Sequence, residues 1–247
     1  MQETELLNFH FNFYDKKDIL ELIIKHSQKS DQFIHFISIN PENLVIAHES
    51  TIFAKAVRSS KYHIADGIGI VIAARLWGQA KPGRATGVDT MDMLIRYAAK
   101  HSLGCLLIGG EANLAEKVSD CYKKLFPRVN IKGLRSIKNI QRPSIKEEQQ
   151  IEDIVKLVKP YFVFVAFGSP YQEIWIERHK KLFKGCFVMG VGGAFAFLSK
   201  QTSRAPKLVR QIGLEWLFRL IQQPWRIKRQ LNRLPCFIYL ILKERFR

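Results

Sequence analysis

One uninterrupted apolar run constrains the fold of this chain more than any other feature. It covers residues 161–167, Tyr-Phe-Val-Phe-Val-Ala-Phe, and ends at Gly168-Ser-Pro170. A strand that is apolar at every position is covered on both faces, as in a parallel sheet with helices on either side. The run therefore predicts an α/β fold in which strands alternate with crossover helices.

The same alternation extends over the first 200 residues. Further strands are expected at 33–39, 105–108 and 186–189, and residues 63–67 are expected to form a short strand that leads into a turn. Helices are expected at 42–59, 68–77, 88–101, 111–125, 144–158 and 171–182, and loops at 81–84 and 131–143, the second with at most one edge strand. From Ala205 onward only helical patterns occur, and Pro224 divides them into two helices. We predict an α/β domain over 1–200, with a mostly parallel sheet and helices on both faces, and a helical appendage over 201–247.

The charge of the chain points to an anionic partner. The net charge is +17, and residues 200–247 carry twelve basic residues against two acidic ones, a net charge of +10. Nucleic acid, an acidic membrane surface and a phosphorylated substrate all fit this sign. No apolar run reaches the roughly 18 residues that a membrane-spanning helix needs, but the run at 236–242 could lie in a membrane interface.

Cysteine usage and the N-terminus favour a cytosolic protein. The four cysteines are widely spaced without a Cys-x-x-Cys motif, as expected for buried thiols, and acidic residues interrupt the N-terminal apolar residues, unlike a signal peptide.

No histidine spacing suits zinc and no Asp-x-Asp could present Mg²⁺, so no metal and no cofactor is expected. If a diphosphate leaves at this site, arginines must balance its developing charge, which directs attention to Arg84, Arg219, Arg226 and Arg229.

Ligands of an open parallel sheet gather at the carboxyl ends of its strands, so the residues that follow the strands are the candidates for a shared cleft. Asp66 is the one carboxylate among them, and it can act as a general base or form an Asx-turn or helix cap. The others are Ser38, Asn40, Gly109, Gly110, Gly168, Gln172 and the cluster Gly190-Val-Gly192-Gly193.

Two glycine turns invite both a functional and a structural interpretation. Gly168-Ser-Pro-Tyr-Gln172 opens a helix whose free N–H groups can receive a phosphate while Gln172 faces the ligand; alternatively, Ser169 simply caps that helix. The Gly190–Gly193 cluster can admit a nucleotide or serve tight packing. It is not a P-loop, and no early Gly-x-Gly-x-x-Gly occurs, which disfavours NAD.

Several ordered motifs resemble one known family. They are 64–69 (IADGIG), 84–89 (RATGVD), 107–110 (LIGG), 166–173 (AFGSPYQE), 190–195 (GVGGAF), 204–206 (RAP) and 213–220 (GLEWLFRL). In order, they resemble the signatures of the WecG/TagA/CpsF glycosyltransferases. The resemblance covers about residues 36–233.

The resemblance implies a Rossmann-like fold whose helical appendage closes over the site and contacts an anionic membrane surface. It implies an inverting enzyme, peripheral on the cytoplasmic face of the membrane, that moves N-acetylmannosamine, its uronic acid or a related hexose from a UDP-sugar to a polyprenyl-diphosphate-linked sugar. The pathways so implied are enterobacterial common antigen, wall teichoic acid, capsule and exopolysaccharide. Homo-oligomers are compatible with the resemblance, and nucleic acid is not an expected partner.

The resemblance also implies roles for single residues. Asp66 would be the general base, with Ser38 and Asn40 on the acceptor side. Arg84 and Gln172 would bind the donor, and Arg219, Arg226 and Arg229 would complete the pocket.

Three positions depart from the family pattern. Ser38 stands where threonine is common, Ala196 where an aspartate is usual, and Lys200 where a glycine is usual. Because a carboxylate is lost at Ala196, a catalytically impaired member acting as a scaffold remains an alternative. A nucleic-acid-binding module, favoured only by the charge, is the other.

Overall fold

A computed structural model describes residues 2–26, 31–79, 82–111, 113–134, 137 and 140–246, without the side chains of Gln2 and Arg229. Lys81 of the predicted loop 81–84, four residues of the predicted loop 131–143, and Arg247 lie outside the described residues. No helix in these ranges is both long and apolar enough to cross a membrane.

Eight strands form one mixed sheet in the order β1-β2-β4-β3-β8-β7-β5-β6. Strand β2 pairs with β4, β3 with β8, β5 with β6 and β7, and β7 with β8, all in parallel, whereas β1 and β2 form an antiparallel hairpin. This confirms the predicted mostly parallel α/β architecture. The strands are β1 (Gln2–Leu6), β2 (Phe9–Phe13), β3 (Ile34–Ile39), β4 (Tyr62–Ala65), β5 (Cys105–Gly109), β6 (Ile131–Leu134), β7 (Phe162–Ala166) and β8 (Phe187–Gly190).

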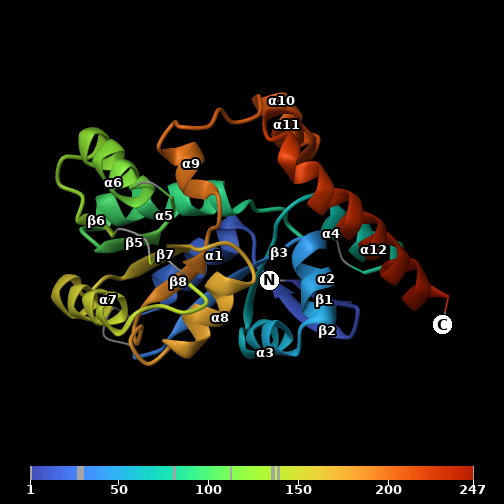
Figure 1. The fold of residues 1–247 in the computed structure, drawn as a ribbon, viewed down its shortest axis with the longest axis horizontal. Helices are drawn as coiled ribbons and strands as arrows, with labels where there is room; N and C mark the ends of the chain where they lie inside the picture. The colour runs from blue at the N-terminus through green and yellow to red at the C-terminus, as the bar shows by residue number, and fades with distance from the viewer. Residues whose placement is uncertain are drawn as a thin grey trace. The chain divides into compact units, whose positions relative to one another are not determined.

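The helices alternate with the strands and then form the C-terminal appendage (Figure 1). They are α1 (Lys16–Lys25), α2 (Pro41–Glu49), α3 (Thr51–Ser59), α4 (Ile68–Leu76), α5 (Gly87–His101), α6 (Leu114–Leu125), α7 (Ile145–Val158), α8 (Tyr171–Arg178), α9 (Ala194–Leu198), α10 (Lys207–Gln211), α11 (Glu215–Gln222), the 3₁₀ turn η1 (Pro224–Arg226) and α12 (Ile227–Arg245).

The appendage was expected to form two helices divided at Pro224, but it forms α10, α11 and α12, because Gly213, with φ of 87°, ends α10 before α11 begins. Two further parts of the chain differ from the sequence predictions. The single helix expected at 42–59 is two helices, because the side chain of Ser50 accepts a hydrogen bond from the N–H of Phe53 and starts a new helix there. The N-terminal hairpin was not predicted at all. Its second strand nevertheless alternates, with Phe9, Phe11 and Phe13 buried between two more polar residues.

Residue contacts divide the chain into two compact units. Unit 1 comprises residues 1–19, 38–86 and 203–247, and unit 2 comprises residues 20–37 and 87–202. The division at 202/203 lies close to the predicted start of the appendage. The appendage segment therefore belongs to the same unit as the first part of the chain.

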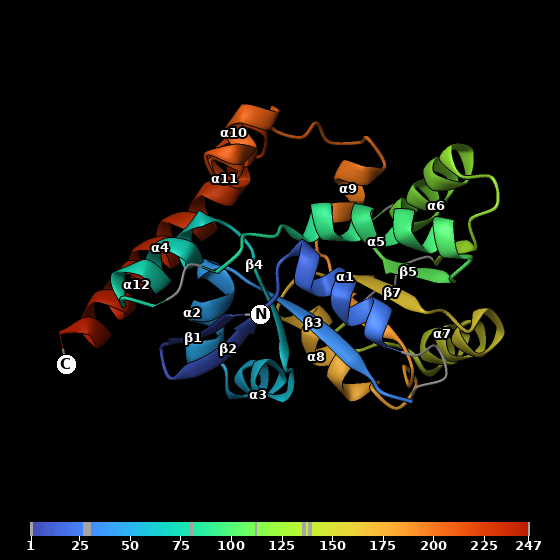
Figure 2. The same cartoon turned by 180° about the vertical axis from the view of Figure 1, so that it is seen from behind.

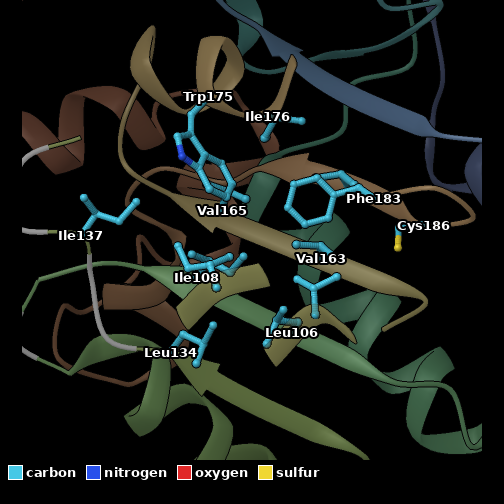
Figure 3. Close-up of a cluster of buried hydrophobic side chains, with 13 residues drawn as sticks. Leu106, Ile108, Leu134, Ile137, Val163, Val165, Trp175, Ile176, Phe183 and Cys186 are labelled. Carbon is cyan, nitrogen blue, oxygen red and sulfur yellow. The ribbon is translucent and has the colours of Figure 1, made fainter. Parts of the chain in front are cut away.

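Unit 2 holds a hydrophobic core on each face of its strands. Figures 1 and 2 show α5, α6 and α9 on one side of β5, β6 and β7, and α7 and α8 on the other. Alternate residues of β5, β7 and β8 face α7 and α8, where Trp175, Ile176 and Phe183 are buried against them (Figure 3). The continuous apolar run of β7 is therefore explained, because both of its faces are covered.

In unit 1, α12 packs on α2. Phe237 and Ile241 of α12 are buried, and the carboxylate of Glu244 accepts hydrogen bonds from the N–H groups of Leu7 and Asn8 at 2.9 and 3.2 Å. The last helix is therefore joined both to α2 and to the tip of the β1–β2 hairpin.

Candidate functional site

Asp66 lies at the carboxyl ends of two strands in unit 1. It directly follows β4, and its N–H donates to the carbonyl of Ile39, the last residue of β3, at 2.8 Å. The residue at the N-cap of α4 is Gly67, with φ of 98° and no side-chain cap bond. Asp66 is therefore not the cap of this helix, which removes one of the two structural alternatives for it.

The environment of Asp66 alters its acidity. Burial raises the pKa of Asp66 to about 6, and the negative charge of Glu215 acts in the same direction. The positive charges of Arg219, Arg84 and Arg204 oppose this rise in pKa. A carboxylate with a pKa near 6 is ionised at neutral pH and is a stronger base than an ordinary aspartate, which suits proton abstraction.

The appendage is fastened to the body around this carboxylate. Arg204 donates from Nε to Oε1 of Glu215 at 2.8 Å and from Nη2 to the hydroxyl of Thr86 at 3.1 Å. Arg84 donates to the carbonyl of Arg210, whose own Nε donates to the carbonyl of Ala205 at 3.0 Å. These bonds bring the end of α10 and the beginning of α11 to the segment that follows β4.

Gly213 allows this close approach. A Cβ at this position would lie 2.8 Å from Cβ of Ile68 and 3.2 Å from a guanidinium nitrogen of Arg84. Its φ of 87° is also one that residues with a side chain rarely adopt. The glycine of the GLEW motif is thus required by packing at the site.

Ser38 and Asn40 flank the end of β3. The hydroxyl of Ser38 is buried and has no hydrogen-bond partner within the described part of the chain. Asn40 caps α2 by accepting from the N–H of Asn43 at 2.9 Å, with Pro41 at the first position of the helix as expected. A buried, unpaired hydroxyl is unfavourable by itself, so Ser38 is suited to a ligand.

The glycines of unit 2 form turns at the ends of β5, β7 and β8. Gly109, Gly110, Gly168 and Gly192 all have positive φ. The N–H of Gly110 donates to the carbonyl of Ala166 at 3.0 Å, which joins the ends of β5 and β7.

Gln172 connects two of these turns. Its side-chain oxygen accepts from the N–H groups of Gly168, at 3.2 Å, and Gly192, at 3.0 Å. The N-cap of α8 is Pro170 without a side-chain cap bond, and the hydroxyl of Ser169 donates to Glu173 at 2.8 Å. Ser169 is therefore not the expected simple cap.

The predicted site residues thus form two groups. Asp66, Arg84 and Arg219 interact electrostatically in unit 1, near Ser38 and Asn40, whereas Gly109, Gly110, Gly168, Gln172 and Gly192 lie in unit 2. That both groups share one cleft stays a prediction. Arg226 donates to the side chain of Gln223, and the side chain of Arg229 lies outside the description.

Sequence reasoning assigned no role to Arg204 or Glu215. Two signals pointed to them: Arg204 opens one of the quoted motifs, and Glu215 is one of only two acidic residues after residue 200.

Lys200, which replaces a usual glycine, has φ of 62°, so this position retains the conformation that favours glycine. No cluster of three or more potential metal ligands occurs among the described residues.

Comparison with known proteins identifies the family. The model of the glycosyl transferase WecG/TagA/CpsF family matches residues 4–247. A relative from Bacillus subtilis (strain 168) is 31% identical over 246 residues, which cover 99% of this chain and 93% of the relative. One from Staphylococcus aureus (strain MW2) is 25% identical over 236 residues, covering 94% and 90%. Both are named N-acetylglucosaminyldiphosphoundecaprenol N-acetyl-beta-D-mannosaminyltransferase. The chain belongs to the WecG/TagA/CpsF family of glycosyltransferases.

Proposed function

We propose that this protein is an inverting glycosyltransferase that moves N-acetylmannosamine or a related hexose from a UDP-sugar to a polyprenyl-diphosphate-linked N-acetylglucosamine. The family, and the names of relatives that align over nearly their whole length, support the acceptor class. The observation that carries the chemistry is Asp66, a carboxylate of raised pKa whose charge interacts with those of three arginines.

In the proposed reaction, Asp66 removes the proton from the acceptor hydroxyl as its oxygen attacks the anomeric carbon of the donor. The bond between that carbon and the diphosphate oxygen breaks, and the electron pair leaves with UDP. Attack from the face opposite the leaving group inverts the anomeric configuration. Arg219 and Arg84 stabilise the charge on the diphosphate, and the buried hydroxyl of Ser38 binds the acceptor.

We further propose that the appendage binds an anionic membrane surface on the cytoplasmic face. On α12, the face next to the buried Phe237 and Ile241 carries exposed apolar residues at helical spacing, called here the apolar stripe: Ile227, Leu231, Leu234, Ile238 and Leu242. Basic residues flank it, and Trp216 and Trp225 of the preceding segment are also exposed. This combination is typical of helices that lie in a membrane interface.

The decisive experiment is a screen of UDP-sugars against a synthetic lipid-diphosphate N-acetylglucosamine, with UDP release and the disaccharide product as readouts. Release that requires both substrates supports the proposal. A chain that binds UDP and the acceptor without forming product would instead favour the scaffold alternative. A salt-sensitive gel shift with generic DNA or RNA, without turnover, would favour the nucleic-acid alternative.

A further inference from the structure

The side-chain amide of Gln172 has every hydrogen-bonding position occupied within the protein. Its oxygen accepts two bonds, from the N–H groups of Gly168 and Gly192. Its nitrogen donates two, to the hydroxyl of Ser169 at 3.2 Å and to Oε1 of Glu173 at 2.7 Å. An amide offers two acceptor sites and two N–H bonds, so none is left for a ligand.

These bonds also fix which way the amide points. The two glycine N–H groups are donors and require the oxygen, whereas Glu173 offers an acceptor and requires the nitrogen. Glu173 is itself fully buried, and the hydroxyl of Ser169 donates to the same Oε1 at 2.8 Å. Glu173 therefore orients the Gln172 amide, with Ser169 bonded to both.

The neighbouring strand has a glycine where the amide lies. A Cβ on Gly190, the last residue of β8, would lie 2.7 Å from Nε2 of Gln172 and 2.9 Å from its Cδ. Any larger residue would displace the amide, because Gln172 is only 3% exposed and has little room to move. Gly190 thus makes space for the side chain that joins the two turns.

The turns so joined follow adjacent parallel strands. Val165 of β7 pairs with Gly190 of β8, and Gly168 and Gly192 are each the second residue beyond the end of their strand. Carboxyl ends of neighbouring parallel strands are where such sheets bind ligands. The spacing and shape of the two loops are therefore set by one buried amide.

We propose that Gln172 is a positioning residue, which holds the Gly168 and Gly192 turns in the shape that receives the donor diphosphate. Gln172 does not itself contact the donor, and Glu173 orients the Gln172 amide. The inference rests on the proposed function, because it concerns the donor side of that site. It replaces the direct role that the family resemblance implies for Gln172.

An exchange of the two side chains provides the test. Gln172→Glu keeps an oxygen for the glycine N–H groups but turns a second oxygen toward Glu173, so the bond between the two residues is lost. The double variant Gln172→Glu/Glu173→Gln restores a donor and an acceptor at the same place. UDP affinity is measured by titration calorimetry, and amide exchange at Gly168 and Gly192 by NMR of protein labelled with ¹⁵N-glycine. Gln149→Glu on α7 is the matched control.

We expect the single variant to bind UDP on the order of tenfold more weakly and to exchange both glycine amides faster, since a buried polar group has lost its partner. The double variant should recover most of the UDP affinity and most of the protection of the two glycine amides from exchange. The control should match the wild type. Weakened UDP binding with unchanged exchange, or without recovery in the double variant, would show direct contact with the donor and overturn the proposal.

A second pair of variants covers the case in which the single variant does not fold. Gly190→Ala should weaken UDP binding in the wild-type background and add little in a Gln172→Ala background, where no amide remains to be displaced. Equal effects in both backgrounds would contradict the inference. Failure of the proposed function would look different. In that case the wild-type chain would bind no UDP, while amide exchange at the two glycines would still depend on Gln172 and Glu173. The donor site would then be disproved, but the structural link between the two turns would stand.

Discussion

Nε of Arg204 lies 2.8 Å from Oε1 of Glu215, and this ion pair joins the motif before α10 to the first turn of α11. The same Glu215 raises the pKa of Asp66, while the charge of Arg204 lowers it. The pair therefore orders the start of the appendage, which Arg204 also bonds to Thr86, and its two charges act in opposite directions on the pKa that burial raises. An appendage that only recruited the enzyme to a membrane would have no such connection to Asp66.

Replacing Asp66 by Asn should abolish transfer while UDP binding persists. Loss of a general base typically lowers the rate by about 10²- to 10⁴-fold. Since the pKa of Asp66 in the folded protein is above that of an ordinary aspartate, its contribution to stability falls as the pH rises from about 4 to about 6. The variant should consequently be at least as stable as the wild type at pH 8. Turnover and thermal melting are compared with Asp120→Asn on exposed α6 surface; near wild-type turnover in Asp66→Asn would end the assignment.

The pH profile of kcat/KM should fall on the acid side with an apparent pKa near 6, because only the ionised Asp66 accepts a proton and kcat/KM reports the free enzyme. Glu215→Gln should move this limb to lower pH, since it removes the negative charge that raises the pKa of Asp66. If the acid limb of the kcat/KM profile did not move in Glu215→Gln, a group other than Asp66 would control that limb.

Arg219→Gln should move the same limb to higher pH, because a positive charge that favours the ionised Asp66 is lost. It should also lower kcat on the order of 10²-fold, the scale for removing one preorganised charge-stabilising donor. Arg128→Gln, an exposed arginine in unit 2, is the matched control. A shift of the limb without loss of kcat would indicate that Arg219 tunes Asp66 but does not act on the diphosphate.

Activity should persist in excess EDTA. The reason is that the arginines are proposed to balance the charge of the leaving diphosphate, a role that a divalent cation has in enzymes with an Asp-x-Asp motif. UDP release is followed with and without the chelator. Loss of activity that Mg²⁺ or Mn²⁺ restores would assign that charge to a metal.

Local sequence patterns were sufficient for most of the sheet and for the position of Asp66. Strands covered on both faces appear in the sequence as continuous apolar runs. A carboxylate that directly follows such a run can be identified without knowledge of the tertiary structure. The hairpin of β1 and β2 is harder to predict, because each strand has only five residues and polar residues interrupt the apolar ones, so neither strand forms a continuous apolar run. The break at Ser50 depends on a single capping bond, which the helical pattern through 42–59 conceals.

The contacts at the candidate site were much harder to predict. Arg204 and Glu215 are eleven residues apart and meet only because α10 and α11 fold back on each other. Gln172 and Gly192 are twenty residues apart, and their hydrogen bond requires two neighbouring strands to end at the same level. Such contacts depend on tertiary packing, and a motif can mark the residues without showing what they bind.

The apolar stripe of α12 should carry membrane binding. Leu231 is 65% exposed and Ile238 49% exposed, whereas Phe237 and Ile241 on the adjacent face are buried in unit 1. Leu231→Glu/Ile238→Glu therefore adds two negative charges to the exposed face without disturbing the packed one. We expect weaker binding to vesicles that contain anionic lipid, since both apolar insertion and electrostatic attraction are reduced.

The effect on catalysis should depend on the acceptor. Turnover of the lipid-linked acceptor in vesicles should fall in parallel with binding, while turnover of a water-soluble acceptor analogue should stay near the wild-type rate, because Asp66 and its arginines are unchanged. The matched control is Ile145→Glu/Leu157→Glu, which adds the same charges at exposed apolar positions of α7, 86% and 75% exposed. If the control weakened vesicle binding as much as the stripe variant, general charge repulsion would explain the loss. If the stripe variant bound vesicles normally, α12 would not be the membrane-facing element, and its exposed apolar residues would need another explanation.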